Sequence, residues 1–402
     1  MVNYSCRTSE NGSNLSLLYN SENGGKDVLM KRLIAIGLLF CLVLIGCAKE
    51  ETIEPITTQP TETEPEPTVV QTQPTEEETE PVIEETEPVV VYRNPLTGEV
   101  LDQPYTGRIV SVSIGNTKDA LPHLGIAHAD MIYEVETEGG ITRFMPIFSN
   151  YDFAENIGPV RSARTYYNNI SASYGACLAH CGGSVRGIKG YYDLTGGLIP
   201  NWVHLDQRNN GAYFFRDSAR KAAGYLLEHT MCTTGEKMTK AMADKGYGQD
   251  IPVDFGYRFA EDENLTISGQ AATEVVVSFL GKKTTTFVYD AQQGVYGMSQ
   301  YNGRKVIDGN TNEEIFFKNL IVIYSAQSKQ HDGYYSRSYY DLIGSGNGYF
   351  AVNGQIVPIK WSRAALTSPF VYTLEDGTPI TLGVGTTYVA VASPNSAPLV
   401  AK

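Results

Sequence analysis

Two alternating segments joined by a pair of glycines constrain the fold of this chain more than any other feature. Residues Met131–Glu138 and Ile141–Phe148 each alternate with a period of two, which is typical of β-strands. The Gly139-Gly140 pair between them can supply the positive φ angles that a two-residue hairpin turn requires. We therefore predict a β-hairpin here.

A two-residue turn also fixes the register of this hairpin, and the register decides on which face each side chain lies. The expected pairs are Glu138 with Ile141, Glu136 with Arg143 and Glu134 with Met145. All three carboxylates then share one face, which makes that face a candidate wall of an active site. The expected core face carries Tyr133, Val135, Phe144 and Pro146.

An export signal is predicted near the N-terminus. Met30-Lys31-Arg32 places positive charge ahead of the apolar run Leu33–Ile45, whose 13 residues fall short of the roughly 20 that span a bilayer. The run leads into Leu44-Ile45-Gly46-Cys47, which is typical of a bacterial lipobox, where the small residue permits cleavage and Cys47 takes up lipid such as palmitate. The alternative is a buried cysteine in a signal-anchor helix.

The acidic charge of the chain is concentrated in one segment. Residues 48–92 hold 13 Glu against a single Lys, so they carry −12 of the formal net charge of −14. This mixture of Thr, Glu, Pro, Gln and Val cannot bury enough apolar surface to fold, and we expect a disordered, extended tether. The rest of the chain from Arg93 onward carries only −3 and has no basic blocks, which argues against nucleic acid as a partner.

These features divide the chain into six parts. Residues 1–29 are polar and aperiodic, and we expect them to be either absent from the natural product or disordered. The signal follows at 30–47 and the tether at 48–92. We then predict an α+β domain at 93–250, a linker at 251–273 and a β-rich domain at 274–402.

Helices are expected only in the first of these two domains, so the fold class is α+β. Pro159 fits the first turn of a helix that continues to Tyr174, a second helix is predicted at Tyr213–Glu228 and a short third at Thr239–Lys245. Arg108–Ile114 is predicted to be a strand. In the second domain the period is two nearly throughout, which predicts strands at Glu274–Leu280, Thr285–Tyr289, Val295–Gln300, Asn319–Ser325, Gly348–Val352, Gln355–Lys360 and Thr387–Val391.

The cysteines do not form an evident disulfide framework. Cys177, Cys181 and Cys232 remain after the predicted cleavage site, and four-residue spacing rarely gives bridging geometry. We expect apolar packing for most of them, with a bridge from Cys232 to one of the others as the alternative. The histidines show no metal-ligand spacing, so no metal and no cofactor are predicted.

Several strings in this sequence, besides the lipobox and the tether, are distinctive when they are read together. They are Asn94–Gly98, Ala129–Glu134, Glu138–Phe144, Gly158–Arg164, His180–Ser184, Gly344–Gly346, Gly348–Phe350, Asn353-Gly354 and Trp361–Arg363. With these strings the chain resembles the YerB-like lipoproteins of Gram-positive cell surfaces, a family long described only as a domain of unknown function. The resemblance covers about Arg93–Val391 in two segments. It implies a two-part lipoprotein of the cell envelope and identifies no catalytic residues.

Glu138 is the candidate catalytic acid. Breaking a glycosidic bond requires a carboxyl group whose pKa is raised by burial or by a neighbouring carboxylate. Glu138 at the mouth of the hairpin, with Glu136 or Glu134 on the same face, fits the geometry of two carboxylates. The alternative is a solvated strand face on which Glu136 pairs with Arg143 for at most ~1 kcal/mol.

A candidate anion site follows the hairpin. Arg161 and Arg164 lie three residues apart at the start of the predicted helix, so they are expected to point the same way and to bind an anion together with Ser162 and the free amides of the first turn. Peptide-stem carboxylates, lactyl groups and teichoic-acid phosphates are the anions expected outside the cell. The alternative is that the arginines merely neutralise the carboxylates of the hairpin.

His180 and Ser184 flank Cys181-Gly182-Gly183, a loop that a ligand can approach closely. Neighbouring residues on a strand face opposite ways, so His180 cannot activate Cys181 without a turn, and a hydrogen-bonding role in a pocket is favoured over a Cys or Ser hydrolase. Tyrosine pairs such as Tyr191-Tyr192 and Tyr339-Tyr340 suit either sugar stacking or strand packing, and strand packing is favoured.

Together these features predict a protein held by lipid on the outer face of the cell membrane that acts on peptidoglycan. The sharper hypothesis is a glycan-cleaving enzyme of the lytic transglycosylase kind, with Glu138 as acid and then base and Arg143, Arg161 and Arg164 holding anionic parts of the substrate. The alternative is a non-catalytic envelope binding or scaffold lipoprotein that recruits or regulates cell-wall enzymes. A solute-binding role is a third hypothesis and is disfavoured, because the strand-helix alternation of those folds is missing.

Overall fold

The computed structural model describes residues 90–184, 204–248, 253–261, 265–281, 283–331 and 335–402. The predicted signal, the predicted lipidation site Cys47 and almost all of the predicted tether lie outside these ranges, as do Tyr191, Tyr192 and Trp202. No helix within the described ranges has both the length and the apolar character needed to cross a membrane.

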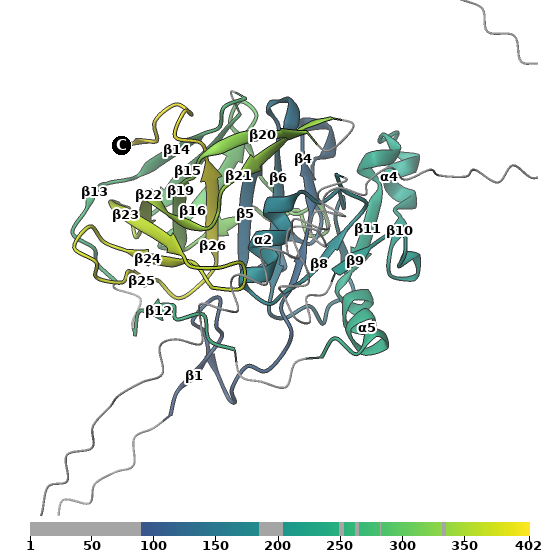
Figure 1. Ribbon diagram of the computed structural model, residues 1–402, viewed down its shortest axis with the longest axis horizontal. Helices are drawn as coiled ribbons and strands as arrows, with labels where there is room; N and C mark the ends of the chain where they lie inside the picture. The colour runs from purple at the N-terminus through teal and green to yellow at the C-terminus, as the bar shows by residue number, and fades with distance from the viewer. Residues whose placement is uncertain (1–89, 185–203, 249–252, 262–264, 282, 332–334) are drawn as a thin grey trace, which may run out of the picture. The chain divides into compact units, whose positions relative to one another are not determined.

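One large sheet organises the described residues, with twelve strands among them. Figure 1 shows these strands from β23 and β22 on one side, through β26 and β5, to β8 and β9 on the other. The order along the sheet is β13 (Gln270–Ala271), β23 (Gln355–Arg363), β22 (Gly344–Val352), β19 (Asn319–Tyr324), β26 (Thr387–Ala392), β5 (Met131–Glu136), β6 (Thr142–Phe148), β3 (Val110–Val112), β8 (Cys177–His180) and β9 (His204–Asp206), with β24 (Val371–Thr373) beside β23 and β4 (Ile114–Asn116) beside β6.

The two predicted domains share this sheet. β5 pairs in parallel with β26, and β26 pairs in parallel with β19, so strands of both predicted domains are hydrogen-bonded neighbours. All six residues of β5 and all six of β26 are buried, as expected for parallel strands covered on both faces. The described residues belong to one compact unit, so the boundaries predicted at 93–250 and 274–402 divide the sequence and not the sheet.

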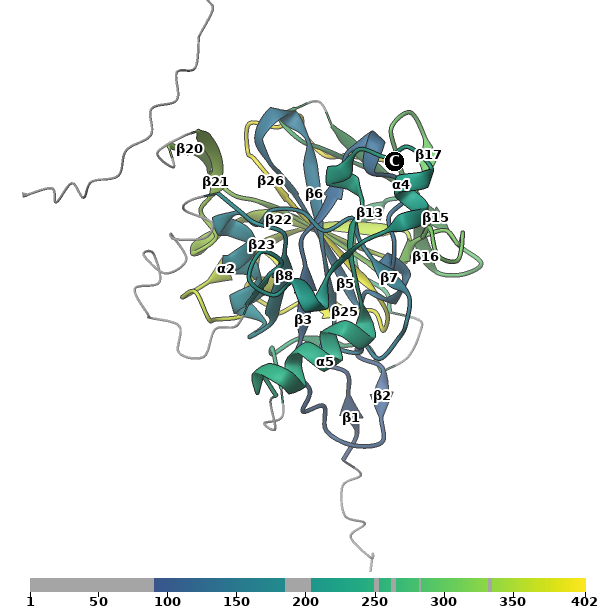
Figure 2. The same cartoon turned by 90° about the vertical axis from the view of Figure 1, so that its right-hand side faces the viewer.

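The two faces of the large sheet are covered differently. One face packs against a six-stranded sheet and the helix α5 (Gly235–Lys245), and the other packs against the helix α2 (Thr165–Ser173). Figure 2 shows α2 on one side of β5 and β6, and β15 and β16 on the other. The smaller sheet consists of β17 (Arg304–Lys305), β16 (Val295–Gln300), β15 (Thr284–Asp290), β14 (Glu274–Ser278), β27 (Val400–Ala401) and β18 (Phe316–Phe317).

The remaining elements are short. The other α-helix that the described residues form is α4 (Ser218–Ala222). The remaining strands are β1 (Tyr92–Arg93) with β2 (Val100–Leu101), β7 (Asn156–Ile157) with β11 (Met231–Thr234) and β10 (Phe215–Arg216), β12 (Arg258–Phe259) with β25 (Thr381–Leu382), and β20 (Gln327–His331) with β21 (Ser336–Tyr340). Single 3₁₀ turns occur at Lys118–Ala120, Ile126–His128, Glu138–Gly140, Gly211–Tyr213 and Leu227–His229.

The predicted strands of the second domain are confirmed, and so is the α+β class. Each of the seven predicted segments coincides with a strand from β14 to β26, within a few residues at the ends. Turns with glycine or asparagine at positive φ, such as Asn353-Gly354 between β22 and β23, separate adjacent strands as the sequence pattern requires.

The helix predictions are only partly correct. α5 is longer than predicted because Thr234 caps its first turn and Gly246 ends it in the left-handed conformation. The helix predicted at Tyr213–Glu228 is wrong: this stretch contains β10 and the single short helix α4, which ends just before Gly224 at positive φ.

The start of α2 is also wrong in the prediction, and this matters for the site. The helix begins at Thr165 and not at Pro159, because the backbone before Thr165 is extended and hydrogen-bonded to neighbouring segments. The Arg161 amide donates to the Ser113 carbonyl and the Ala163 amide donates to the Gly182 carbonyl. These hydrogen bonds hold Arg161–Arg164 as an extended segment that cannot join the helix.

The hairpin itself is confirmed, but its register is shifted by one residue. Glu134 lies opposite Phe144 and Glu136 opposite Thr142, because the turn holds three residues, Glu138 to Gly140, with both glycines at positive φ. The Thr137 amide closes the turn on the Ile141 carbonyl. Arg143 therefore lies on the face opposite to Glu134 and Glu136, and Phe144 shares the face of these two carboxylates, contrary to the prediction.

Glu134 does not belong to an exposed wall. Its side chain is fully buried between the two sheets, where its carboxylate accepts hydrogen bonds from five side chains. The donors come from both predicted domains and are Asn116, Thr142, Thr285, Gln300 and Tyr388. The nearby Lys283 donates to Gln300 at 2.7 Å, and burial lowers the pKa of Lys283 to about 8 even though Glu134 acts to raise it. Glu134 is therefore a structural residue that joins the two parts of the chain.

His123 lies fully buried beside Phe144, with ring centroids 4.7 Å apart. Neither ring nitrogen has a well-aligned hydrogen-bond partner in the described part of the chain, although the Gly115 backbone is close. Burial, with the charges of Lys283 and Arg220 nearby, lowers the pKa of His123 to about 3. The imidazole is therefore neutral in the folded protein at physiological pH.

This burial predicts a pH dependence of stability. Below about pH 6.5 His123 is protonated in the unfolded chain, whereas in the folded chain it stays neutral down to about pH 3. The free energy of unfolding therefore falls as the pH falls, by at most about 1.4 kcal/mol per pH unit. We expect His123→Phe to remove this contribution and to flatten the slope. Urea unfolding between pH 7 and pH 4 measures it, with His128→Gln as the control that keeps the slope. Equal slopes for wild type and His123→Phe would contradict the assignment.

Candidate functional site

The predicted site residues from three distant stretches meet where the extended segment before α2 runs beside the loop after β8. The Cys181 amide donates to the Arg161 carbonyl at 3.0 Å, and the Ser162 hydroxyl donates to the Cys181 carbonyl at 3.0 Å. The Ser184 amide donates to the Ala163 carbonyl at 3.4 Å. These contacts place Ser162 and Ser184 on neighbouring segments, and Arg143 of the hairpin donates to the Ser162 carbonyl. We call Arg143, Arg161 and Arg164 the arginine cluster.

Glu138 is held by the arginine cluster as an ionised carboxylate. Arg164 donates to it from Nε and Nη2, the shortest contact being 2.7 Å, and the Ser338 amide donates at 3.1 Å. Arg337 lies 3.6 Å away. Burial alone would raise the pKa of Glu138, but the hydrogen bonds and charge of Arg164 hold it below its usual value. This is opposite to the shift that a general acid requires, because the proton must be present before it can be donated.

The pKa of Glu136 is raised, unlike that of Glu138. Its side chain is almost completely buried and accepts a hydrogen bond from the Gly281 amide at 3.3 Å. Burial is the largest cause that raises the pKa of Glu136, and it outweighs the backbone hydrogen bonds that lower it. The three carboxylates of the hairpin therefore have three separate environments and do not form one shared wall.

Arg143 is the least compensated charge of the cluster. Only 6 % of the residue is exposed, and Nη1 donates to the Ser162 carbonyl. It forms no ion pair with any residue that the structure describes, whereas Arg164 pairs with Glu138. Burial, with Arg164 close by, lowers the pKa of Arg143 to about 10, so the guanidinium is still charged at neutral pH.

Arg161 and Arg164 do not point the same way. Arg161 lies 3.4 Å from the Glu228 carboxylate and donates to the Glu228 carbonyl at 3.1 Å, whereas Arg164 turns to Glu138. The prediction of a shared direction was wrong because it assumed helical spacing. Residues three apart on an extended segment face opposite sides.

His180 is buried and its tautomer follows from its contacts. Nδ1 is 2.7 Å from the Gly182 carbonyl, which can only accept, so Nδ1 carries the proton. Nε2 must then accept from His204 Nδ1–H at 3.0 Å. Burial is the main cause that lowers the pKa of His180, so the pair is neutral at physiological pH. Cys181 instead directs its thiol to Gln207 at 3.4 Å, so His180 does not contact this thiol. The hydrogen-bonding role of His180 in a pocket stays a prediction.

Two residues of this site were missed by sequence reasoning. Asp206 is almost fully buried and accepts from the Gly182 amide at 2.9 Å, and Arg208 donates to it at 2.6 Å. With His204 they form a polar alternation, His-Leu-Asp-Gln-Arg, which places three polar side chains on one face of a strand and its extension. That alternation was the signal in the sequence. Asp206 fixes the loop that carries Gly182, next to Ser162.

The three cysteines that the structure describes are free thiols, in agreement with the favoured prediction. Cys177 and Cys232 are buried, and burial raises the pKa of each thiol to about 12. Cys181 is half-buried. Among the described residues no three His, Cys, Asp or Glu side chains converge as metal ligands.

Comparisons with known proteins agree with the two-part organisation of the sequence. Residues 96–248 match the N-terminal domain of the family described as protein of unknown function DUF3048, and residues 275–389 match its C-terminal domain. YerB of Bacillus subtilis (strain 168), named as a predicted lipoprotein, is 28% identical over 277 residues, which cover 67% of this chain and 77% of YerB.

A crystal structure of a similar protein is also known. The crystal structure of YerB protein from Bacillus subtilis superposes with a TM-score of 0.61 at 24% identity, over 74% of this chain and 96% of that one. At this identity the match supports the fold alone. The two matched domains and the shared fold lead to one conclusion: the chain belongs to the YerB-like, two-part DUF3048 family.

Proposed function

We propose that this protein is a lipid-anchored lipoprotein on the outer face of the cell membrane that binds an anionic cell-wall polymer through the arginine cluster and does not cleave it. The observation that carries the proposal is Arg143, a nearly buried guanidinium without an ion pair among the described residues. A buried charge of this kind is stabilised by an anion that accepts its remaining hydrogen bonds.

The surroundings of Arg143 favour an anionic ligand. Arg161 and Arg164 are close enough to lower its pKa, and the cluster as a whole has two carboxylates for three guanidinium groups. A planar guanidinium binds carboxylate or phosphate in a bidentate manner. Outside the cell, the anions of matching chemistry are peptide-stem carboxylates of peptidoglycan and phosphates of teichoic acids.

The location is supported by sequence and by similarity. The charged start, the short apolar run and the lipobox that ends at Cys47 predict lipidation, and the similar protein YerB is itself named as a predicted lipoprotein. The acidic tether would hold the folded part away from the membrane, towards the wall.

Cleavage of the glycan is the second candidate, with Glu136 as the acid. The raised pKa of Glu136 is the one observation that favours it. Glu138, ion-paired with Arg164, is less suited to donate a proton, although it remains the second carboxylate of the hairpin end.

A binding assay with cell-wall sacculi tests the proposal. The full-length chain is mixed with purified sacculi before and after removal of teichoic acids, and the bound fraction is measured by sedimentation while released fragments are analysed by mass spectrometry. We expect binding without release, and we expect Arg143→Met to weaken binding at least about tenfold, because one charged hydrogen-bonded contact contributes roughly 1.5–3 kcal/mol.

The controls separate binding from folding. Arg258→Met removes an exposed arginine of β12 and should bind like the wild type. Arg143→Lys keeps the positive charge but lacks the planar guanidinium that binds an anion through two hydrogen bonds, so intermediate binding is expected. Circular dichroism checks that this variant is correctly folded. Unchanged binding by Arg143→Met would overturn the proposal. Anhydro-muramic products that disappear in Glu136→Gln would establish cleavage instead.

A further inference from the structure

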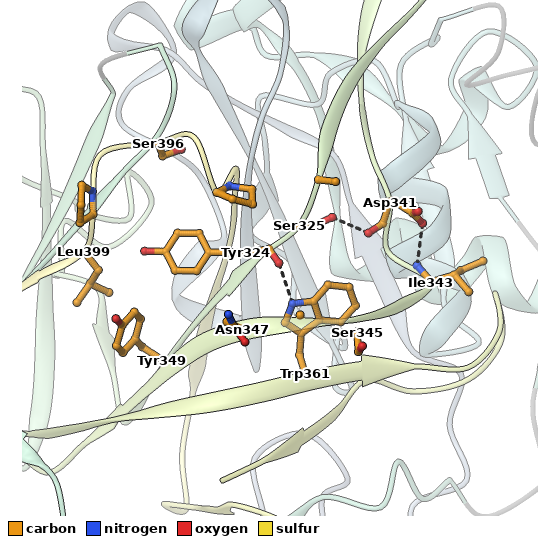
Figure 3. Close-up of a pocket in the computed structure, with 14 residues that line it drawn as sticks. Tyr324, Ser325, Asp341, Ile343, Ser345, Asn347, Tyr349, Trp361, Ser396 and Leu399 are labelled. Carbon is orange, nitrogen blue, oxygen red and sulfur yellow. Dashed lines mark hydrogen bonds between the residues drawn. The ribbon is translucent and has the colours of Figure 1, made fainter. Parts of the chain in front are cut away.

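A concave site lies in the C-terminal part of the chain, and its lining includes no residue of the arginine cluster. Its volume is about 510 Å³, within the range of roughly 300–1,000 Å³ typical of small-molecule sites. It is built by the ends of β19 and β23, the start of β22 and the segment that precedes β27. Figure 3 shows the aromatic side chains Tyr324, Tyr349 and Trp361 together with Asn347, Ser345 and Ser396 around it.

The indole ring of Trp361 forms the floor of this pocket and is rigidly held. It is only 2 % exposed, and Nε1 donates to the Tyr324 carbonyl at 2.9 Å. Gly346 lies opposite Trp361 in the β22–β23 ladder, where a Cβ atom would lie 2.6 Å from the indole nitrogen. Glycine at this position therefore leaves the room that the indole ring occupies.

Two tyrosine rings form a corner above this floor. Tyr324 and Tyr349 are half-buried, with ring centroids 6.3 Å apart and ring planes at 83°. Leu399 continues the apolar wall beside them, as Figure 3 shows. The exposed parts of such rings provide rigid apolar faces, which match the C–H face of a pyranose ring.

Polar groups surround this aromatic corner. Asn347 Oδ1 accepts from Lys360 at 2.6 Å, which leaves the amide N–H groups of Asn347 as the donors to a ligand. Asp341 provides exposed carboxylate oxygens at the rim. The Ser396 hydroxyl is buried and has no hydrogen-bond partner in the described ranges. A buried hydroxyl without a partner costs about 1–3 kcal/mol, a cost that a ligand hydroxyl would remove.

The charge of the pocket distinguishes it from the arginine cluster. None of the described residues that line it is an arginine, a lysine or a histidine, and Asp341 is its one acid. Lys360 contacts the lining residue Asn347, with its Nζ donating to Asn347 Oδ1 at 2.6 Å. Within the lining itself, an anionic ligand would meet only the negative rim. The chemistry suits a ligand that is uncharged, has an apolar ring face and carries many hydroxyl groups.

We infer that this pocket binds the uncharged pyranose rings of a saccharide. Tyr324 and Tyr349 contact the ring faces, and Asp341, Asn347 and Ser396 hydrogen-bond the hydroxyl or acetamido groups. The identity of the saccharide as a cell-wall glycan rests on the proposed function, but binding of neutral sugar rings does not. If both hold, one polymer is bound by its anionic groups at the arginine cluster and by its sugar rings here.

Titration of the full-length chain with three neutral tetrasaccharides tests the inference. The probes are tetra-N-acetylchitotetraose, cellotetraose and maltotetraose, and the readouts are calorimetry and the tryptophan fluorescence to which Trp361 contributes. We expect saturable binding of at least one probe, weakened at least about tenfold by Tyr349→Ala and by Asn347→Ala. Tyr335→Ala is the matched control, because this tyrosine is 63 % exposed and lies outside the pocket lining.

The outcomes separate this inference from the proposed function. Arg143→Met should bind the tetrasaccharide as tightly as the wild type even if it no longer binds sacculi. Tyr349→Ala, by contrast, should lose binding of the tetrasaccharide. The inference would be overturned by the absence of binding of any tetrasaccharide at millimolar concentration, or by binding that Tyr349→Ala and Asn347→Ala leave unchanged. Binding of a polyproline peptide in place of the sugars would also overturn it, since prolines dock on aromatic grooves as well. Asn347 is exposed, so its variant is expected to fold.

Discussion

Replacing Glu134 by leucine is expected to lower the free energy of unfolding by about 3–5 kcal/mol, the loss typical of breaking a buried charged network. The substitution removes the acceptor of five buried donors and leaves Lys283 as a buried charge without its nearby carboxylate. Urea unfolding of the full-length chain, followed by circular dichroism, measures the loss.

Two further variants make the Glu134 experiment specific. Glu134→Gln keeps the shape and part of the hydrogen bonding, so a smaller loss is expected than for leucine. Glu313→Gln alters an exposed carboxylate and should leave the urea midpoint unchanged. A loss for Glu134→Leu no larger than that for Glu313→Gln would show that the network does not join the two parts of the chain.

Gly281→Ala is expected to cost about 3 kcal/mol of unfolding free energy, at the upper end of the range for overpacking. A Cβ atom at Gly281 would lie 2.0 Å from Gly140 Cα and 2.4 Å from the Gly140 carbonyl oxygen. Both are backbone atoms, so no side-chain rotation relieves the contact. The hairpin turn must move away from the β14–β15 turn, and Glu136 then loses the Gly281 amide as a donor.

The matched control for this substitution is Gly211→Ala. Gly211 has open space around its Cα and does not require positive φ, so the same chemical change should have little effect there. The comparison is made by urea unfolding as above. If the two variants unfold at the same midpoint, the close contact between Gly140 and Gly281 does not exist in solution.

Local patterns predicted the strands well because alternation reports directly on burial at each residue. The strands from β14 to β26 and the hairpin of β5 and β6 follow this signal. The failures occurred where tertiary hydrogen bonds override local preference. Arg161–Arg164 looked helical by spacing, yet its backbone is paired with Ser113 and Gly182.

The candidate site was predictable as a set of residues but not as a geometry. The sequence pointed to Arg143, Ser162 and His180, and the structure brings them together at one place. It did not reveal that Glu138 pairs with Arg164, because the two lie 26 residues apart and no local spacing links them. The one-residue shift of the hairpin reversed the face of Arg143, since a three-residue turn is equally compatible with two glycines.

The sequence by itself determined the strand-rich second part, the glycine hairpin and the family, and it predicts the export signal and the tether. Only the tertiary structure decided which carboxylate is buried, which is ion-paired, and that both parts of the chain share one sheet. The physical reason is that these properties depend on contacts between residues far apart in the chain, such as the hydrogen bond from Tyr388 to Glu134 across 254 residues. The pocket over Trp361 has the same origin, because four separate segments must fold together before it exists.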